Sequence, residues 1–209
     1  MNRLLMTVVM ALSMPVWALA QGNTWETNEN LQQTNVPAPN PDAKYLAGAV
    51  PEVDGKVVFS VRLKAPGLSA GEIYARLLAE LKRQVSEPGQ FEQSRVAYTD
   101  ADRHELAGSY MEWLVFKSTA LVLDRTRLMY RLVITCRDGE ADMTMQNIHY
   151  LYDEERQPEA INAEDWITDK QGLNRKQTKL ARLSGKFRRK TIDRKDYLFK
   201  RYQDVLDAK

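Results

Sequence analysis

The chain has 209 residues, of which 44% are hydrophobic and 28% charged, and a formal net charge of +2, an ordinary globular composition. This length is enough for one sizeable core or two small ones. A single cysteine excludes an intramolecular disulfide, so stability must come from burial. Charge is unevenly distributed: residues 21–169 carry 15 Lys and Arg against 24 Asp and Glu, whereas residues 170–201 carry 13 against 2. The sequence predicts an acidic body with a basic C-terminal segment.

Residues 1–20 have the order of a secretory signal peptide. Arg3 precedes an apolar run over residues 4–14, and Ala18 with Ala20 forms a small-residue cleavage site. The run is shorter than the ~20 apolar residues that span a bilayer. We therefore expect an exported protein, periplasmic or secreted, without a transmembrane segment after cleavage; an uncleaved anchor is the alternative. The chain has no cysteine near this site, so we do not expect a lipoprotein.

Residues 21–50 are rich in Asn, Gln, Thr and Pro and lack periodicity, which predicts a flexible polar linker. Residues 57–64 then alternate apolar and polar side chains, as a half-buried strand does. Ser69 and Glu72 form a capping box at the start of a helix. The connecting turn, APGLSAG, lacks the glycine and lysine pattern of a phosphate loop, and Glu72 puts negative charge where a phosphate would bind. We interpret this turn as structural.

Consecutive strands follow the helix. Asp138-Gly139 predicts a two-residue hairpin turn between two alternating runs. Cys136 lies on the same strand face as the apolar residues that precede it at even-numbered positions, so we expect a buried structural thiol. The predicted order is strand, helix, four strands and helix, with an additional C-terminal helical segment. This order favours an α+β fold with a mainly antiparallel sheet and helices on one face.

Three stretches within residues 52–153 carry a family resemblance: DGKVVFSVRLKAPGLSAGEIY, YRLVITCRDG and NIHYLY. They resemble the secreted proteins of Bacteroides-type bacteria grouped as domain of unknown function 4468, with a TBP-like fold. The resemblance implies a curved antiparallel sheet over residues 51–155. The family has no assigned activity, so the resemblance implies no catalytic residues.

We expect residues 156–209 to form a basic, largely helical extension. Asn162 and Asp165 are suited to cap a short helix that contains Trp166. Asp193 and Asp196 are suited to the start of a last helix. The apolar residues of that helix, which we expect to pack on the sheet, are Leu198, Tyr202, Val205 and Leu206.

The basic run GKFRRK, residues 185–190, has three interpretations. Its cations pair with the acidic body or are solvated; they bind an envelope polyanion or an acidic protein partner; or they bind nucleic acid, which an exported protein rarely meets. The residues of the candidate anion site are Lys186, Arg188, Arg189, Lys190, Arg194 and Lys195.

The sequence supplies little for catalysis. His104 and His149 have no second His or Cys at metal spacing, so we expect no metal site and no cofactor. Carboxylate pairs such as Glu154 and Glu155 are compatible with glycoside hydrolysis, but are typical of solvated loops. Trp113, Tyr150 and Tyr152 are interpreted either as a sugar-binding face or as ordinary packing.

We therefore predict a non-enzymatic binding or assembly module at the bacterial cell envelope. The alternative is an envelope glycan hydrolase that uses Asp and Glu residues we do not identify. The hydrolase requires a deep pocket with at least two carboxylates of shifted pKa. The binding module requires a shallow basic or aromatic surface.

Overall fold

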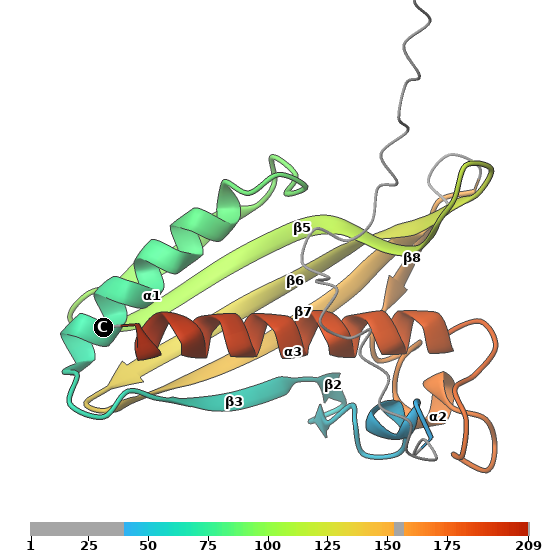
Figure 1. Ribbon diagram of the computed structural model, residues 1–209, viewed down its shortest axis with the longest axis horizontal. Coiled ribbons are helices and arrows are strands. Elements are labelled where there is room, and N and C mark those ends of the chain that lie inside the picture. Colours follow the sequence, from blue (N-terminus) through green and yellow to red (C-terminus); the bar gives the residue numbers. More distant parts are fainter. Residues whose placement is uncertain (1–39, 153–156, 209) are drawn as a thin grey trace, which may run out of the picture.

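The computed structural model describes residues 40–152 and 157–208, so the predicted signal peptide and most of the predicted linker lie outside the described residues. One antiparallel sheet is covered on one face by two long helices (Figure 1). No helix in the described ranges is long and apolar enough to cross a membrane. The elements are η2 (Ala43–Tyr45), β1 (Glu52–Val53), β2 (Lys56–Val57), β3 (Phe59–Lys64), α1 (Ala70–Val85), β4 (Arg95–Asp100), β5 (Glu105–Ser118), β6 (Leu123–Arg137), β7 (Glu140–Tyr152), β8 (Glu159–Asn162), α2 (Asp169–Gly172) and α3 (Gly185–Asp207).

The sheet has the strand order β3-β7-β6-β5-β4, and β8 also pairs with β7. β3 pairs with the first part of β7, and β8 pairs with its last residues. The predicted α+β fold is confirmed, with its curved antiparallel sheet and its order of strand, helix, four strands and helix. β8 and the small β1-β2 hairpin are additions that the sequence did not predict, because strands of two to four residues are too short to show periodicity.

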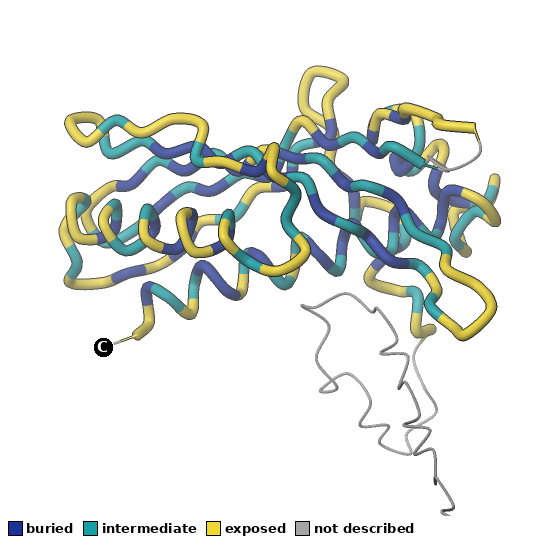
Figure 2. The backbone as a smooth tube through the Cα atoms, turned by 90° about the horizontal axis from the view of Figure 1, so that it is seen from above, coloured by how far each residue is buried: buried dark blue, intermediate teal, exposed yellow. Residues whose placement is uncertain are grey.

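Strand alternation gives the sheet one buried and one half-exposed face. On β6, the even-numbered residues from Leu128 to Ile134 are buried, whereas the odd-numbered residues between them are half-exposed or exposed. Figure 2 shows this alternation of buried and more exposed positions along the strands. α1 and α3 cover the buried face with apolar side chains such as Leu77 and Leu198. Because successive strand residues point to opposite faces, these helices bury every second residue.

Cys136 continues the buried face of β6, as predicted. It is a free thiol with 4% of its surface exposed, and burial raises its pKa to about 12. A thiol with this pKa stays protonated at neutral pH and is a poor nucleophile. Its role is therefore packing.

The strand-helix connection and the β6-β7 hairpin stabilise each other. The predicted capping box is present: Glu72 accepts a hydrogen bond from the Ser69 amide, and Ser69 Oγ accepts one from the Glu72 amide. Asp138 Oδ1 accepts a hydrogen bond from the Ala70 amide at 2.8 Å, and the Gly139 amide donates to Leu68 at 2.9 Å. Amide groups at the start of α1 are thus occupied within the chain, which agrees with a structural role for this turn.

The predicted domain boundaries need correction. Tyr45 and Val50, which we expected in the flexible linker, are 6% and 4% exposed and belong to the core. The residues after 155 are no separate extension, because α3 crosses the covered face of the sheet and shares the core with α1 (Figure 1). The physical reason is that α1 alone does not cover a sheet of this width.

The helices after β7 also differ from the prediction. Asn162 ends β8, and Trp166 lies in a turn before α2, whose N-cap is Thr168. α3 begins at Gly185 rather than near Asp193, so GKFRRK forms its first turns. The sequence pattern did not predict this start, because arginines occupy positions on the buried face of α3 where apolar residues are usual. Its later residues Leu198, Tyr202 and Leu206 are buried as predicted, and Val205 is half-buried.

Candidate binding surface

Arg188 of the predicted anion site is completely buried. Its guanidinium donates hydrogen bonds to the carbonyl oxygens of Tyr45, Leu46 and Ile167 at 2.6–2.7 Å. It also pairs with Asp169 at 2.7 Å. Arg188 therefore ties the first described segment and the loop before α2 to α3, and its donors are occupied within the chain.

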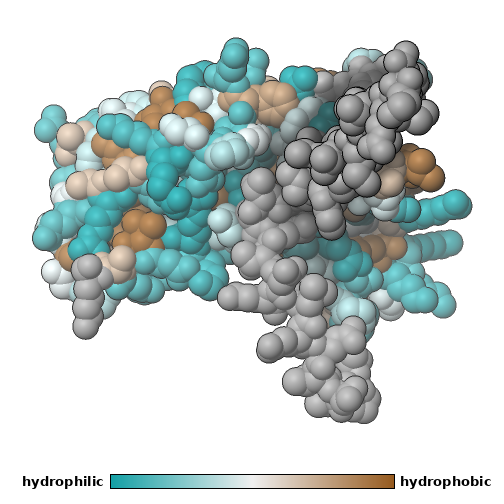
Figure 3. All heavy atoms as spheres, turned by 45° about the horizontal axis from the view of Figure 1, so that its top comes forward, coloured by the Kyte–Doolittle hydropathy of each residue, from teal (hydrophilic) through white to brown (hydrophobic). Residues whose placement is uncertain are grey.

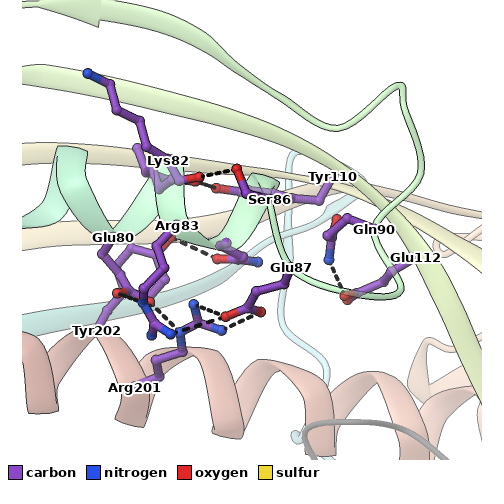
Figure 4. Close-up of polar contacts among 12 residues, drawn as sticks. Glu80, Lys82, Arg83, Ser86, Glu87, Gln90, Tyr110, Glu112, Arg201 and Tyr202 are labelled. Carbon is purple, nitrogen blue, oxygen red and sulfur yellow. Dashed lines mark hydrogen bonds and ion pairs between the residues drawn. The ribbon is translucent and has the colours of Figure 1, made fainter.

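Arg194 is 2% exposed and lies between α3 and the sheet. Its guanidinium donates two hydrogen bonds, of 2.6 and 2.7 Å, to the carboxylate of Glu112 on β5. Gln90 donates a third bond to the same carboxylate at 2.7 Å (Figure 4). Burial by itself would lower the pKa of Arg194, but the Glu112 charge raises it above its ordinary value, so the guanidinium stays charged.

A second ion-pair group joins the two long helices. Arg201 on α3 contacts the carboxylate of Glu80 on α1 and pairs with Glu87 at 2.7 Å (Figure 4). Arg83 donates hydrogen bonds to Glu80 at 2.9 Å and to Glu87 at 3.3 Å. The arginines of the basic C-terminal segment thus neutralise acids of the body, in the covered layer.

The lysines and the remaining arginine of the predicted site lie nearer the surface. Lys186 pairs with Asp124 at 2.7 Å, Arg189 pairs with Asp42, Lys195 pairs with Asp196, and Lys190 is half-buried. Lys186, Arg189 and Lys195 thus pair with acids of the same chain, as the first interpretation expects. The prediction that Arg188 and Arg194 directly contact an external polyanion was wrong, because both side chains are buried and inaccessible.

The opposite face of the sheet carries a different set of cations. No described helix covers this face, and its residues alternate with the core residues along the central strands (Figure 2). Its side chains include Arg95 on β4, Ser109, Met111 and Trp113 on β5, Arg125, Arg127, Met129, Arg131 and Val133 on β6, and Asp142, Gln146, His149 and Leu151 on β7. We call this set the open face.

A shallow pocket of about 190 Å³ lies on the open face. Arg95 on β4, Arg131 on β6 and His149 on β7 line it together with Met111 and Met129, and its lining includes no Asp or Glu. Burial lowers the pKa of His149, an effect that Glu164 partly opposes. The pocket therefore combines two permanent cations, a titratable imidazole and an apolar floor.

A bulge shapes this pocket. The register of β6 with β7 shifts between Met129 and Arg131, and Asn147 on β7 has a φ of +57°. Asn tolerates this left-handed conformation better than most residues. A bulge bends its strand and changes the direction of neighbouring side chains. Here it places Asn147 and His149 on the same pocket.

The aromatic candidates do not form one surface. Trp113 lies on the open face, where the Arg125 guanidinium lies 3.7 Å from the centre of its ring and Phe91 packs edge-on at 5.2 Å. Tyr150 is completely buried on the covered face, and Tyr152 contacts Phe187 of α3. Ordinary packing is therefore the confirmed interpretation for both tyrosines.

The other candidate groups do not converge. His104 has a φ of +53° and packs edge-on against Tyr74, with ring centres 5.9 Å apart. Within residues 40–152 and 157–208, no three His, Cys, Asp or Glu side chains are grouped to hold a metal ion. Glu154 and Glu155 lie outside the described residues.

Sequence reasoning missed the pocket, because Arg95, Arg131 and His149 are far apart in the chain and unremarkable locally. A signal was nevertheless present. Residues 125, 127 and 131 place arginines on one side of a strand whose other side is apolar from Leu128 to Cys136. Such alternation predicts a basic sheet face.

Comparison with known proteins identifies the chain's relatives. Residues 59–151 match the family described as a domain of unknown function (DUF4468) with TBP-like fold. The crystal structure of a DUF4468 family protein from Bacteroides ovatus is 39% identical, covers 82% of this chain and 98% of its own, and superposes with a TM-score of 0.75.

A TBP-like protein from Parabacteroides distasonis is 22% identical, covers 76% of this chain and 97% of its own, and has a TM-score of 0.62; it shows the fold alone. No functionally curated protein matches. The resemblance inferred from the strand and turn motifs is confirmed. With 39% identity over most of both chains, this protein belongs to the DUF4468 family.

Proposed function

We propose that this protein is an exported, non-enzymatic binding module of the bacterial cell envelope that holds an acidic group on the open face. The pocket lined by Arg95, Arg131 and His149 carries the proposal, because it is cationic and accessible and has no carboxylate in its lining. The signal-peptide pattern of residues 1–20 supports export. The ligand class is an anionic envelope polymer or an acidic protein segment.

The pocket's chemistry suits this ligand class. A guanidinium presents several N–H groups in one plane and binds carboxylate or phosphate through two parallel hydrogen bonds. Arg131 is an exposed residue of β6 on a rigid central strand, so its backbone position is fixed before binding. Met111 and Met129 offer adaptable apolar contacts to the rest of a ligand.

The buried carboxylates support binding over hydrolysis. A general acid needs access to substrate and a pKa near the working pH. Glu80 and Glu112 are 4% and 5% exposed, and each is bonded to arginine in the covered layer. Their arrangement is that of structural ion pairs.

Binding by a chain that begins at Gln21 tests the proposal. The ligands are polygalacturonate as a carboxylate polymer, lipopolysaccharide as a phosphate source, and polyglutamate as an acidic peptide, each measured by calorimetry across a salt series. We expect binding that weakens with salt, and at least a fivefold loss of affinity in Arg131→Gln or Arg95→Gln, equivalent to about 1 kcal/mol.

Arg175→Gln is the matched control, since Arg175 is also exposed but lies in the loop before α3. Lys190→Gln tests the predicted GKFRRK site at a residue that is not fully buried. Equal losses in Arg131→Gln and Arg175→Gln would show a non-specific charge effect and contradict the proposed pocket.

A further inference from the structure

The turn between β5 and β6 exposes three consecutive large apolar residues. Leu121 is 95% exposed, Val122 45% and Leu123 48%. Single exposed apolar residues are common on proteins, but adjacent ones at a projecting tip indicate an interaction site. In Figure 1 this turn lies at the end of the sheet opposite to the β6-β7 hairpin. On the face that Figure 3 shows, the apolar side chains outside the grey atoms occur in small separate groups.

Hydrogen bonds between Thr119 and Val122 close the backbone of this turn. The Thr119 amide donates to the Val122 carbonyl at 2.8 Å, and the Val122 amide donates to Thr119 Oγ1 at 3.1 Å. The Thr119 hydroxyl in turn donates to the Val122 carbonyl at 3.3 Å. An unsatisfied backbone group is costly in an apolar medium. The closed turn therefore lowers the penalty for moving the tip out of water.

The charges near the tip favour the surface of a lipid bilayer. Residues 117–123 contain no acidic residue, and Lys117 is exposed just behind the apolar residues. Asp124, the nearest acid in the chain, is neutralised by Lys186 at 2.7 Å. A lysine in this position can keep its ammonium at the headgroups while its neighbours enter the acyl region.

We propose that the tip formed by Leu121, Val122 and Leu123 inserts into the interface of a lipid bilayer and holds the protein reversibly at a membrane surface. A convex tip of three side chains is far smaller than the ~800 Å² that a stable protein interface buries on each partner. Insertion into a bilayer needs no matching cavity. Apolar contacts of this size give weak, reversible anchoring.

Co-flotation with vesicles tests the tip. The chain beginning at Gln21, which contains every described residue, is mixed with vesicles of phosphatidylcholine alone or with phosphatidylglycerol. We expect partitioning that largely persists in high salt. The double variant Leu121→Ser and Leu123→Ser should lose at least tenfold in partitioning, because burial of a leucine side chain accounts for that factor.

Leu183→Ser is the control, since Leu183 is 68% exposed in the loop before α3. Arg131→Gln should keep vesicle binding, which separates this inference from the anion-binding proposal. Absence of vesicle binding by the unsubstituted chain, or equal losses in the tip and control variants, would overturn it. The inference would also be overturned if sedimentation showed a dimer that depends on the tip residues while the protein did not bind vesicles.

A fluorescent label reports insertion directly. Cys136 is buried, so a cysteine introduced at the surface reacts selectively with an environment-sensitive dye. We expect Leu121→Cys to give a blue shift with vesicles and quenching by brominated lipid, and Leu183→Cys to give neither. A label at residue 121 that stays in water would contradict insertion.

Discussion

The two faces of the sheet use charge in opposite ways. On the covered face, Arg188, Arg194 and Arg201 are buried, and each binds an acid or a carbonyl oxygen of the same chain. On the open face, Arg95 and Arg131 are exposed and line a pocket without a carboxylate. The densest run of cations in the sequence therefore stabilises the fold, and dispersed cations form the accessible basic surface. Charge density along a chain does not locate a binding site; the face on which each residue lies does.

The largest expected effect comes from breaking the buried pair of Glu112 and Arg194. Glu112→Gln keeps the shape of the side chain but leaves the guanidinium charge buried and uncompensated. We expect a loss of about 3–5 kcal/mol in the free energy of unfolding, measured by urea denaturation. Asp204→Asn, which removes the exposed partner of Lys200, should cost less than about 0.5 kcal/mol. Similar losses in both variants would remove the distinction between the two kinds of ion pair.

Substitutions of two adjacent uncharged residues of β6 test the difference in burial between the two faces of the sheet. Leu132 is completely buried, whereas Val133 on the open face is half-exposed. Leu132→Ala should destabilise by about 2–5 kcal/mol, since it leaves a cavity in the core. Val133→Ala should cost about 1 kcal/mol or less. Denaturation midpoints that fall equally would indicate that the open face is buried against another part of the chain or a partner.

Arg188→Met tests whether α3 holds the first described segment. Methionine fills much of the same volume but leaves the carbonyl oxygens of Tyr45, Leu46 and Ile167 without their donor. We expect a loss of about 2–4 kcal/mol. Hydrogen exchange should accelerate first around residues 43–50. Unchanged protection there would contradict the role assigned to Arg188.

The smallest expected effect is the pH dependence of anion binding. Burial lowers the pKa of His149 below its ordinary value of 6.5, so the imidazole in the folded protein becomes charged only below that pH. Affinity for a carboxylate polymer should rise about fivefold as the pH falls from 7.5 to 5, because one nearby charge contributes about 1 kcal/mol. His149→Gln should abolish this increase.

Folding stability should change in the opposite direction. The unfolded chain takes up the His149 proton at a higher pH than the folded protein does, so proton uptake favours unfolding as the pH falls below about 6.5. Thermal denaturation of the unsubstituted chain and of His149→Gln across this range separates the two effects. Identical pH profiles of binding in both proteins would place His149 outside the site.

Local sequence patterns predicted the central architecture. The alternation on both sides of Asp138-Gly139 predicted β6 and β7, and the pair of Ser69 and Glu72 predicted the start of α1. Each depends on residues close together in the chain. The start of α3 was not predictable in this way, since the buried arginine of its first turn, Arg188, has its partners near Tyr45 and Ile167. The candidate pocket was not predicted for the same reason, because its lining residues are far apart in the chain.

The sequence by itself determined which residues of each strand share a face, where the capped helix and the tight hairpin form, and that Cys136 is buried. Period, capping and turn chemistry act over a few residues, so they are readable in order along the chain. The tertiary structure decided which cations are internal and which are accessible. That outcome depends on which carboxylate lies across from each guanidinium, and residues 112 and 194 meet only when α3 packs on the sheet.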